Sequence, residues 1–250
     1  MAVPARSACA DGFSRLQVRA RRAPNPNVMI PLASTAVALV LAMPTPNSPA
    51  RIVANPGMPA HGPSPAAEGW VRLFNGKDLS GWKVPGPNPY WKVVDGAIVG
   101  TNDPANKGSM LYTQGSWGDF ELEFDAKWTG EIDSGVMFHQ PELQLQLGVS
   151  RSLKVDMTAA FYTGGSERYP IAGRPVGLDA VFRQGAWNRY RLKVRGGHHV
   201  VDVNGKTVTR YSDPRWPVEG PIGLQVHPGL PMTVEFRNLR IRSLGPETLR

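Results

Sequence analysis

Cysteine, long apolar runs and helical periodicity are all scarce in this chain. Cys9 is the single cysteine among 250 residues, so no internal disulfide, zinc–thiolate centre or cysteine nucleophile paired with a second thiol can form. No continuous apolar run reaches the ~20 residues that a membrane-spanning helix needs. After residue 68, no ten-residue window carries an apolar stripe at the helical period. These absences exclude a disulfide scaffold, a polytopic membrane protein and a helical bundle.

Basic residues outnumber acidic residues, but they do not cluster in any one segment of the domain sequence. The net charge is +8. Residues 1–50 hold five arginines and one aspartate (+4), and the remaining residues hold 23 basic and 19 acidic side chains (also +4). No Lys/Arg-rich run follows residue 50, so nucleic acid is not an expected partner.

The N-terminal part has the layout of a secretory signal. Residues 29–43 are apolar, follow an Arg-rich stretch and end at Pro44, which small residues follow. We therefore expect residues 1–50 to be removed on export to the periplasm or the medium, with no stable membrane insertion afterwards. Translation from the start of the apolar segment and retention as an uncleaved anchor are the alternatives. Residues 51–67 are rich in Pro, Gly and Ala and predict a linker, and residues 68–245 predict one domain.

The domain alternates short strand-like runs with turn dipeptides. Residues 187–195, 198–203 and 206–211 are joined by Gly-Gly and Asn-Gly, which predicts two consecutive hairpins. Residues 120–128 alternate cleanly between apolar and charged side chains. Residues 233–241 alternate less regularly, and counting places Val234, Phe236, Asn238 and Arg240 on one side, opposite Glu235, Arg237, Leu239 and Ile241. About a dozen such strands predict an all-β domain of two packed antiparallel sheets.

The segment of residues 133–147, DSGVMFHQPELQLQL, carries the most informative pattern. Its second half places Glu142, Gln144 and Gln146 on one side of a strand and Leu143, Leu145 and Leu147 on the other. A second strand repeats the arrangement, because Gln225 and His227 share one side. A row of acid and amide groups on a sheet face suits sugar hydroxyls, so we expect the whole row to face a solvent-accessible cleft. The plainer alternative is a half-buried strand with a solvated face.

Eight short motifs then occur in a fixed order. They are LFNGKDLSGW, WKVVDG, GDFEL, DSGV, GAWNRY, VNG, GPIGLQ and EFRNLRI, spread over residues 73–241. In this order they resemble the 3-keto-disaccharide hydrolase family. The resemblance implies a concanavalin A-like jelly-roll sandwich with a sugar site on a concave sheet face. It also implies hydrolysis of glycosides whose C3 is already a ketone. Two places depart from the family pattern. DSGVMFH stands where NSGVFLR is usual, so Asp133 and His139 replace an asparagine and an arginine. Residues 148–169 also differ from the usual family sequence.

The chemistry that these residues allow differs from ordinary glycoside hydrolysis. Jelly-roll glucanases use an alternating E-x-D-x-E strand, but here only Glu142 is a carboxylate, which disfavours a two-carboxylate mechanism. A ketone at C3 acidifies the hydrogen on C2, so the C1 substituent can leave by elimination and water can add afterwards. We expect Glu142 as the base, and His139 and His227 as oxyanion donors or leaving-group acids. The expected substrate-binding residues are Gln144, Gln146, Gln225, Asp133 and Asp156.

Plainer interpretations stay open for several of these residues. His227 could serve merely to cap the end of a strand, and His139 could be a satisfied surface histidine. The acidic row of residues 121–125 is interpreted as a solvated convex face. No cofactor is implied. A divalent metal stays open, because Asp133, His139, Glu142 and His227 offer ligand atoms without a metal-binding spacing. Two other functions compete with the 3-keto-glycoside enzyme: a lectin-like glycan-binding module, and a conventional glycosidase that pairs Glu142 with Asp133 or Asp156.

Overall fold

The structure, a computed structural model, describes residues 69–139, 142–215 and 218–245. The expected signal segment and linker lie outside these residues. The described chain folds into strands β1–β15 with a single 3-10 turn, η1 (Ile171–Gly173). Within it, no helix is long and apolar enough to cross a membrane.

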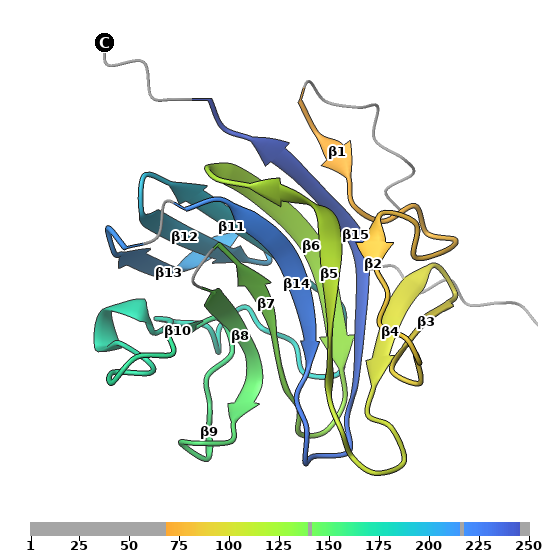
Figure 1. The fold of residues 1–250 in the computed structure, drawn as a ribbon. Helices are drawn as coiled ribbons and strands as arrows, with labels where there is room; N and C mark the ends of the chain where they lie inside the picture. Colours follow the sequence, from red (N-terminus) through yellow and green to blue (C-terminus); the bar gives the residue numbers. More distant parts are fainter. Residues whose placement is uncertain (1–68, 140–141, 216–217, 246–250) are drawn as a thin grey trace, which may run out of the picture. The chain divides into compact units, whose positions relative to one another are not determined.

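One sheet has eight strands, all paired antiparallel (Figure 1). Strand β1 pairs with β15, and the others follow one another in space. In spatial order they are β13 (Lys206–Ser212), β12 (His198–Val203), β11 (Asn188–Arg195), β6 (Phe120–Trp128), β15 (Thr233–Ser243), β4 (Ala97–Thr101) and β3 (Trp91–Val94), with β1 at Val71–Arg72.

The second sheet has seven antiparallel strands and packs against the first. Strand β9 (Val155–Asp156) pairs with β8 outside the main path. In spatial order the others are β10 (Phe161–Tyr162), β8 (Leu143–Ser150), β7 (Asp133–Phe138), β14 (Gly220–Val226), β5 (Ser109–Trp117) and β2 (Trp82–Lys83). Two antiparallel sheets with almost no helix confirm the predicted all-β jelly-roll sandwich.

The core lies between the two sheets and follows from the two-residue alternation of their strands. In β6, every second residue from Phe120 to Ala126 is at most 1% exposed. Across the core, Leu143, Leu145 and Leu147 of β8 are completely buried. These strands therefore contribute one apolar side each to a shared interior, as the sequence predicted.

Strand β15 departs from simple alternation at a β-bulge. Asn238 has a left-handed backbone (φ 56°), and the pairing with β6 shifts register between Arg237 and Arg240. The extra residue reverses the phase of the strand, so Leu239 and Ile241 enter the core. The expectation that Asn238 and Arg240 share a side with Val234 and Phe236 was therefore wrong.

Candidate functional site

The polar row predicted from the sequence lies on the side of the seven-stranded sheet that faces away from the core. Gln144 stands opposite Met137 of β7, and Met137 stands opposite Gly223 of β14. Gln225 follows two residues after Gly223 and so shares this side. We call this side the amide face, after Gln144, Gln146 and Gln225.

The amides bind one another. Gln144 Nε2 donates to Gln146 Oε1 (2.6 Å) and to Gln225 Oε1 (3.2 Å). Gln146 Nε2 in turn donates to Asp133 Oδ1 (2.9 Å). The other Asp133 oxygen accepts the backbone N–H of Arg151 (3.0 Å). The network thus runs from the β14 side of the face to the carboxylate at the start of β7, through side-chain hydrogen bonds of 2.6–3.2 Å.

The segment after β8 covers this network. Tyr169 donates its hydroxyl to Gln146 Oε1 (3.0 Å). The side chains of Met157, Ala160 and Tyr162 pack with Tyr169 in a small apolar cluster of their own. As a result Gln144 is 5% and Gln146 1% exposed, so the expectation of an open cleft along the whole row was wrong. Residues 148–169, where the sequence departs from the pattern of the family it resembles, include the residues of this cover.

The row ends at an exposed carboxylate, that of Glu142, which forms a pair with a tyrosine. Tyr112 of β5 donates its hydroxyl to Glu142 Oε1. Gly223 lies below the tyrosine ring, where a Cβ would be 2.6 Å from a ring carbon, so the glycine lets the ring lie across β14. Burial, and then the bond to Glu142, raise the pKa of the Tyr112 hydroxyl well above its usual value. Tyr112 therefore stays a protonated donor at neutral pH, next to a carboxylate that solvent can reach.

His139, a predicted catalytic residue, lies in the core. Continued alternation would place it on the amide face with Met137, but its left-handed backbone (φ 67°) turns the side chain inward. The ring is completely buried against Phe120, Phe138 and His199. Its Nδ1 lies 2.6 Å from the carbonyl oxygen of Val218. Burial lowers the pKa of His139, which keeps the ring neutral. From this position it cannot touch a substrate on the amide face.

His227 and Asp133 lie at the other end of the amide face from Glu142. The backbone N–H of His227 donates to the Asp133 carbonyl (3.3 Å), and Asp133 pairs with Gly148. Gly148 is six residues along the strand direction from Glu142, a span of about 20 Å. His227 Nδ1 lies 2.8 Å from the carbonyl oxygen of Pro228. The structure therefore does not bring His227 together with Glu142 around one sugar ring.

Asp156 lies apart from both groups. It pairs with Val149, which is in phase with the buried leucines of β8 and not with the glutamines. Its Oδ1 accepts the backbone N–H of Thr158 (2.8 Å), as a turn-stabilising aspartate does. Within residues 69–245 as described, no group of three or more His, Cys, Asp and Glu side chains is close enough to hold a metal ion.

The comparisons with known proteins agree with the fold. Residues 69–242 match the model of the 3-keto-α-glucoside-1,2-lyase-like domain, and the chain belongs to this family. Family membership supports a carbohydrate-active function in general terms. No curated protein sequence matches the chain.

Several solved structures share the architecture. A candidate glycosyl hydrolase from Parabacteroides distasonis ATCC 8503 is 22% identical, with 71% of this chain and 95% of that chain covered (TM-score 0.53). Another from the same organism is 24% identical, with 71% and 84% covered (TM-score 0.51). A native glycosidic hydrolase is 17% identical, with 72% and 99% covered (TM-score 0.52). At these identities the likeness shows the fold alone.

Proposed function

We propose that this domain cleaves or hydrates 3-keto-glycosides at the exposed end of the amide face. The observation that carries the proposal is the pair of Glu142 and Tyr112 in a member of a 3-keto-glucoside lyase-like family. A carboxylate in contact with solvent supplies a base, and a protonated hydroxyl beside it supplies a donor. Tyr112 lies within β5, and Glu142 immediately precedes β8 of the same sheet, so the sheet brings the two groups to one end of the amide face.

The proposed reaction starts at the C2 hydrogen of the keto-sugar ring. Glu142 removes this proton, and the electron pair of the C2–H bond moves to give the enolate of the C3 ketone. The enolate then expels the C1 oxygen, so the C1–O bond breaks and a C1–C2 double bond forms. The leaving oxygen takes up a proton, which Tyr112 is placed to donate. Addition of water across the double bond completes hydration, and release before this addition gives the lyase outcome.

The spacing of carboxylates on the amide face argues against the conventional two-carboxylate mechanism. Retaining and inverting glycosidases hold their two carboxyl groups roughly 5–9.5 Å apart. Asp133 lies about 20 Å along the sheet from Glu142. Asp156 is on the side of β8 that carries the leucines. Glu142 therefore has neither of the partners that the conventional mechanism was expected to use.

Turnover of a matched pair of substrates tests the proposal. The purified chain is incubated with a 3-keto-glycoside and with its unoxidised parent, and release of the aglycone is measured. Release from the oxidised substrate alone is the expected result, since only the ketone acidifies C2. Release from both would support the conventional glycosidase. Binding of either compound without release would support a lectin-like module.

We propose in addition that the enzyme acts outside the cytoplasm. The basis is the apolar segment of residues 29–43 and the small residues that follow it. The mass of the mature protein then corresponds to a chain that starts within residues 51–55. A mass that includes the apolar segment would contradict export with cleavage.

A further inference from the structure

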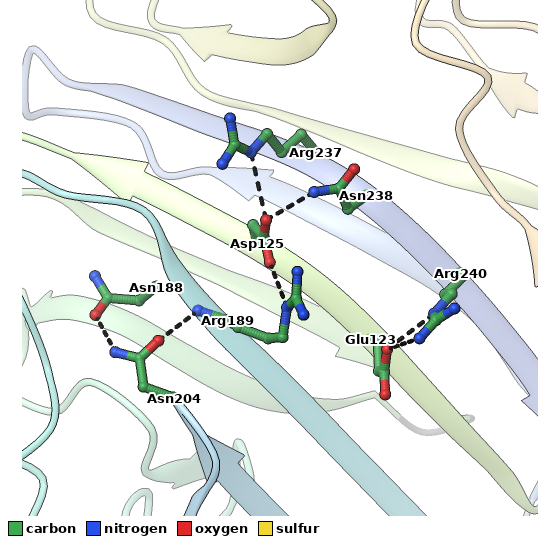
Figure 2. A network of polar contacts seen from close by, with 8 residues as sticks. All are labelled: Glu123, Asp125, Asn188, Arg189, Asn204, Arg237, Asn238 and Arg240. Atoms are coloured by element: carbon green, nitrogen blue, oxygen red, sulfur yellow. Dashed lines mark hydrogen bonds and ion pairs between the residues drawn. The ribbon is translucent and has the colours of Figure 1, made fainter. Parts of the chain in front are cut away.

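The side of the eight-stranded sheet that faces away from the core carries an ordered network of charges. Its carboxylates, Glu121, Glu123 and Asp125, alternate along the central strand β6. Arginines from β11 and β15 flank them on both sides (Figure 2). Asp125 accepts hydrogen bonds from Arg189 (3.1 Å) and Arg237 (3.3 Å). We call this side the arginine face.

Two carboxylates of the arginine face, Glu121 and Asp125, are covered, and the guanidinium groups that bind them form the outer layer. The side chains of Glu121 and Asp125 are 1% and 7% exposed, whereas those of their arginine partners are 36–46% exposed. Burial would raise the pKa of Glu121, but hydrogen bonds from Arg191 and Arg242 hold it below its usual value. The acidic row expected as a solvated face thus lies beneath arginines, and solvent meets a cationic surface.

The surplus positive charge of the domain is confined to this side. Residues 69–245 hold 21 basic and 17 acidic side chains. Strand register places 11 of the basic and five of the acidic residues on the arginine face, which leaves 10 basic and 12 acidic residues elsewhere. Within the face, six cations form ion pairs with four carboxylates. The face therefore carries a net charge of +6 and the rest of the domain −2.

Two tryptophans hold arginines in place on this face. Arg237 lies over the ring of Trp187 (4.0 Å to the ring centre), and Arg240 lies over the ring of Trp70 (4.7 Å). A guanidinium that is stacked on a ring and bound to a carboxylate loses little further side-chain freedom when it binds a ligand. The cations are thus ordered before any partner arrives, with a repeat of about 6.7 Å along each strand.

We infer that the arginine face binds a linear polysaccharide that carries carboxylate groups. These arginines already bind carboxylates of the protein. Because cations outnumber carboxylates on the face, the carboxylates of a ligand can form further ion pairs of the same kind. The face is a broad sheet without an element that could enter the major groove of duplex DNA. Of the large apolar side chains that are exposed in the described chain, Val94 is the one that a strand places on this side. The face therefore lacks the apolar surface of a membrane binder.

Binding of the full chain to polygalacturonate tests this inference without depending on catalysis. Lys193→Gln with Arg210→Gln removes two exposed cations of the face and leaves every ion pair of the network in place. We expect the affinity of this double variant for polygalacturonate to fall by roughly tenfold or more at low ionic strength, because each cation contributes about fivefold. The matched control, Lys77→Gln with Lys107→Gln, removes two exposed cations elsewhere and should change binding by about twofold at most.

The competing ligands decide which partner the face takes. Fully methyl-esterified polygalacturonate, duplex DNA and vesicles containing an anionic phospholipid serve as the comparison. Weaker binding of all three than of polygalacturonate supports the inference. Failure of polygalacturonate to bind, equal losses in the two double variants, or tighter binding of DNA or vesicles overturns it. None of these results bears on turnover of a 3-keto-glycoside, so the enzyme proposal stands or falls separately.

Discussion

The amide face and the arginine face turn the same local pattern into different surfaces. In both, alternation places polar side chains outward and apolar side chains in the core. On the amide face, neutral groups bind one another and a following segment covers them. On the arginine face, neighbouring strands supply cations that cover the carboxylates. The amide face therefore leaves an exposed carboxylate at its end, and the arginine face leaves a continuous cationic layer.

The difference shows what alternation does and does not determine. It fixes the side of the sheet on which a residue lies, because the period of a strand is two. It does not fix exposure: Gln146 and Glu121 both point away from the core, yet each is 1% exposed. Polar side chains on a sheet are covered when their neighbours can pair with them, as buried polar groups require. Glu142 is exposed because it lies at the end of its row.

The largest expected effect is a loss of turnover when Glu142, at the exposed end of the amide face, is changed. Glu142→Gln keeps the shape of the side chain and an acceptor for Tyr112 but removes the base. We expect turnover of a 3-keto-glycoside to fall by about 10²–10⁴-fold with unchanged ligand binding. Steady-state rates together with calorimetric binding of the unoxidised analogue provide the measurement.

The control for this change is Glu131→Gln, which removes the same charge at an exposed position outside the amide face. It should leave turnover unaltered. If Glu142→Gln turns over as fast as the parent, Glu142 is not the base and the proposed elimination loses its proton acceptor.

The next effect concerns the apolar side beneath the glutamines. Leu145 is completely buried in the shared core, so Leu145→Ala leaves a cavity. We expect the free energy of unfolding to fall by about 2–5 kcal/mol, measured by urea denaturation. The exposed Leu153→Ala is the matched control and should be close to neutral. A small loss at Leu145 would mean that the two sheets close around the missing side chain.

Much of the fold was predictable because its signals are local. The clean alternation of residues 120–128 corresponds to β6 without error. The Gly-Gly and Asn-Gly turns correspond to the connections of β11, β12 and β13. The phase of β15 was not predictable by counting, because the bulge at Asn238 depends on a backbone conformation that asparagine tolerates but does not enforce. Asn238 also donates to Asp125 (2.8 Å), a long-range contact.

The candidate site was predictable only in part. The sequence indicated the row of Gln144 and Gln146 and its side of the strand. It missed Tyr112, 30 residues away, because a single tyrosine in a strand carries no signal that it will meet Glu142. It misplaced His139, because alternation was continued through a turn whose left-handed residue reverses the side chain. Contacts between strands far apart in sequence decide these positions.

A third prediction concerns the core between the two faces. His199 is 1% exposed among aromatic rings, and burial and then His139 lower its pKa to about 4. In the unfolded state His199 takes up a proton near pH 6.5, whereas in the folded state it does so only near pH 4. The contribution of neutral His199 to the free energy of unfolding is therefore complete above about pH 6.5 and is lost as the pH falls toward 4. From about pH 7 to about pH 5 we expect a loss of about 2 kcal/mol. The hydrogen bond to the Tyr211 carbonyl and then the charge of Asp213 oppose the shift, and His198 adds to it.

Urea denaturation of His199→Phe at the two pH values provides the measurement. Phenylalanine fills the same aromatic surroundings without a titrating group, so the variant should lose less stability on acidification than the parent. His198→Gln, at the exposed neighbouring position, is the control and should keep most of the pH dependence of the parent, since His198 contributes least to the shift. Identical pH dependence in His199→Phe and the parent would assign the acid sensitivity to other groups.

The smallest effect gives the most direct comparison of the two faces. Gln144→Ala removes the Gln144 donor to Gln225 Oε1 and one of the two donors to Gln146 Oε1, where Tyr169 remains. Glu121→Gln replaces the charged partner of Arg191 and Arg242 by a neutral one. Each change should lower the free energy of unfolding by about 1–2 kcal/mol, since the arginines stay partly hydrated. In concentrated salt the loss at Glu121 should shrink, because ions screen its half-exposed partners, whereas the loss at Gln144 should persist. Urea denaturation at low and high ionic strength measures both. Equal salt dependence would mean that the arginine face stabilises the sheet through the packing of its arginine stems and not through charge.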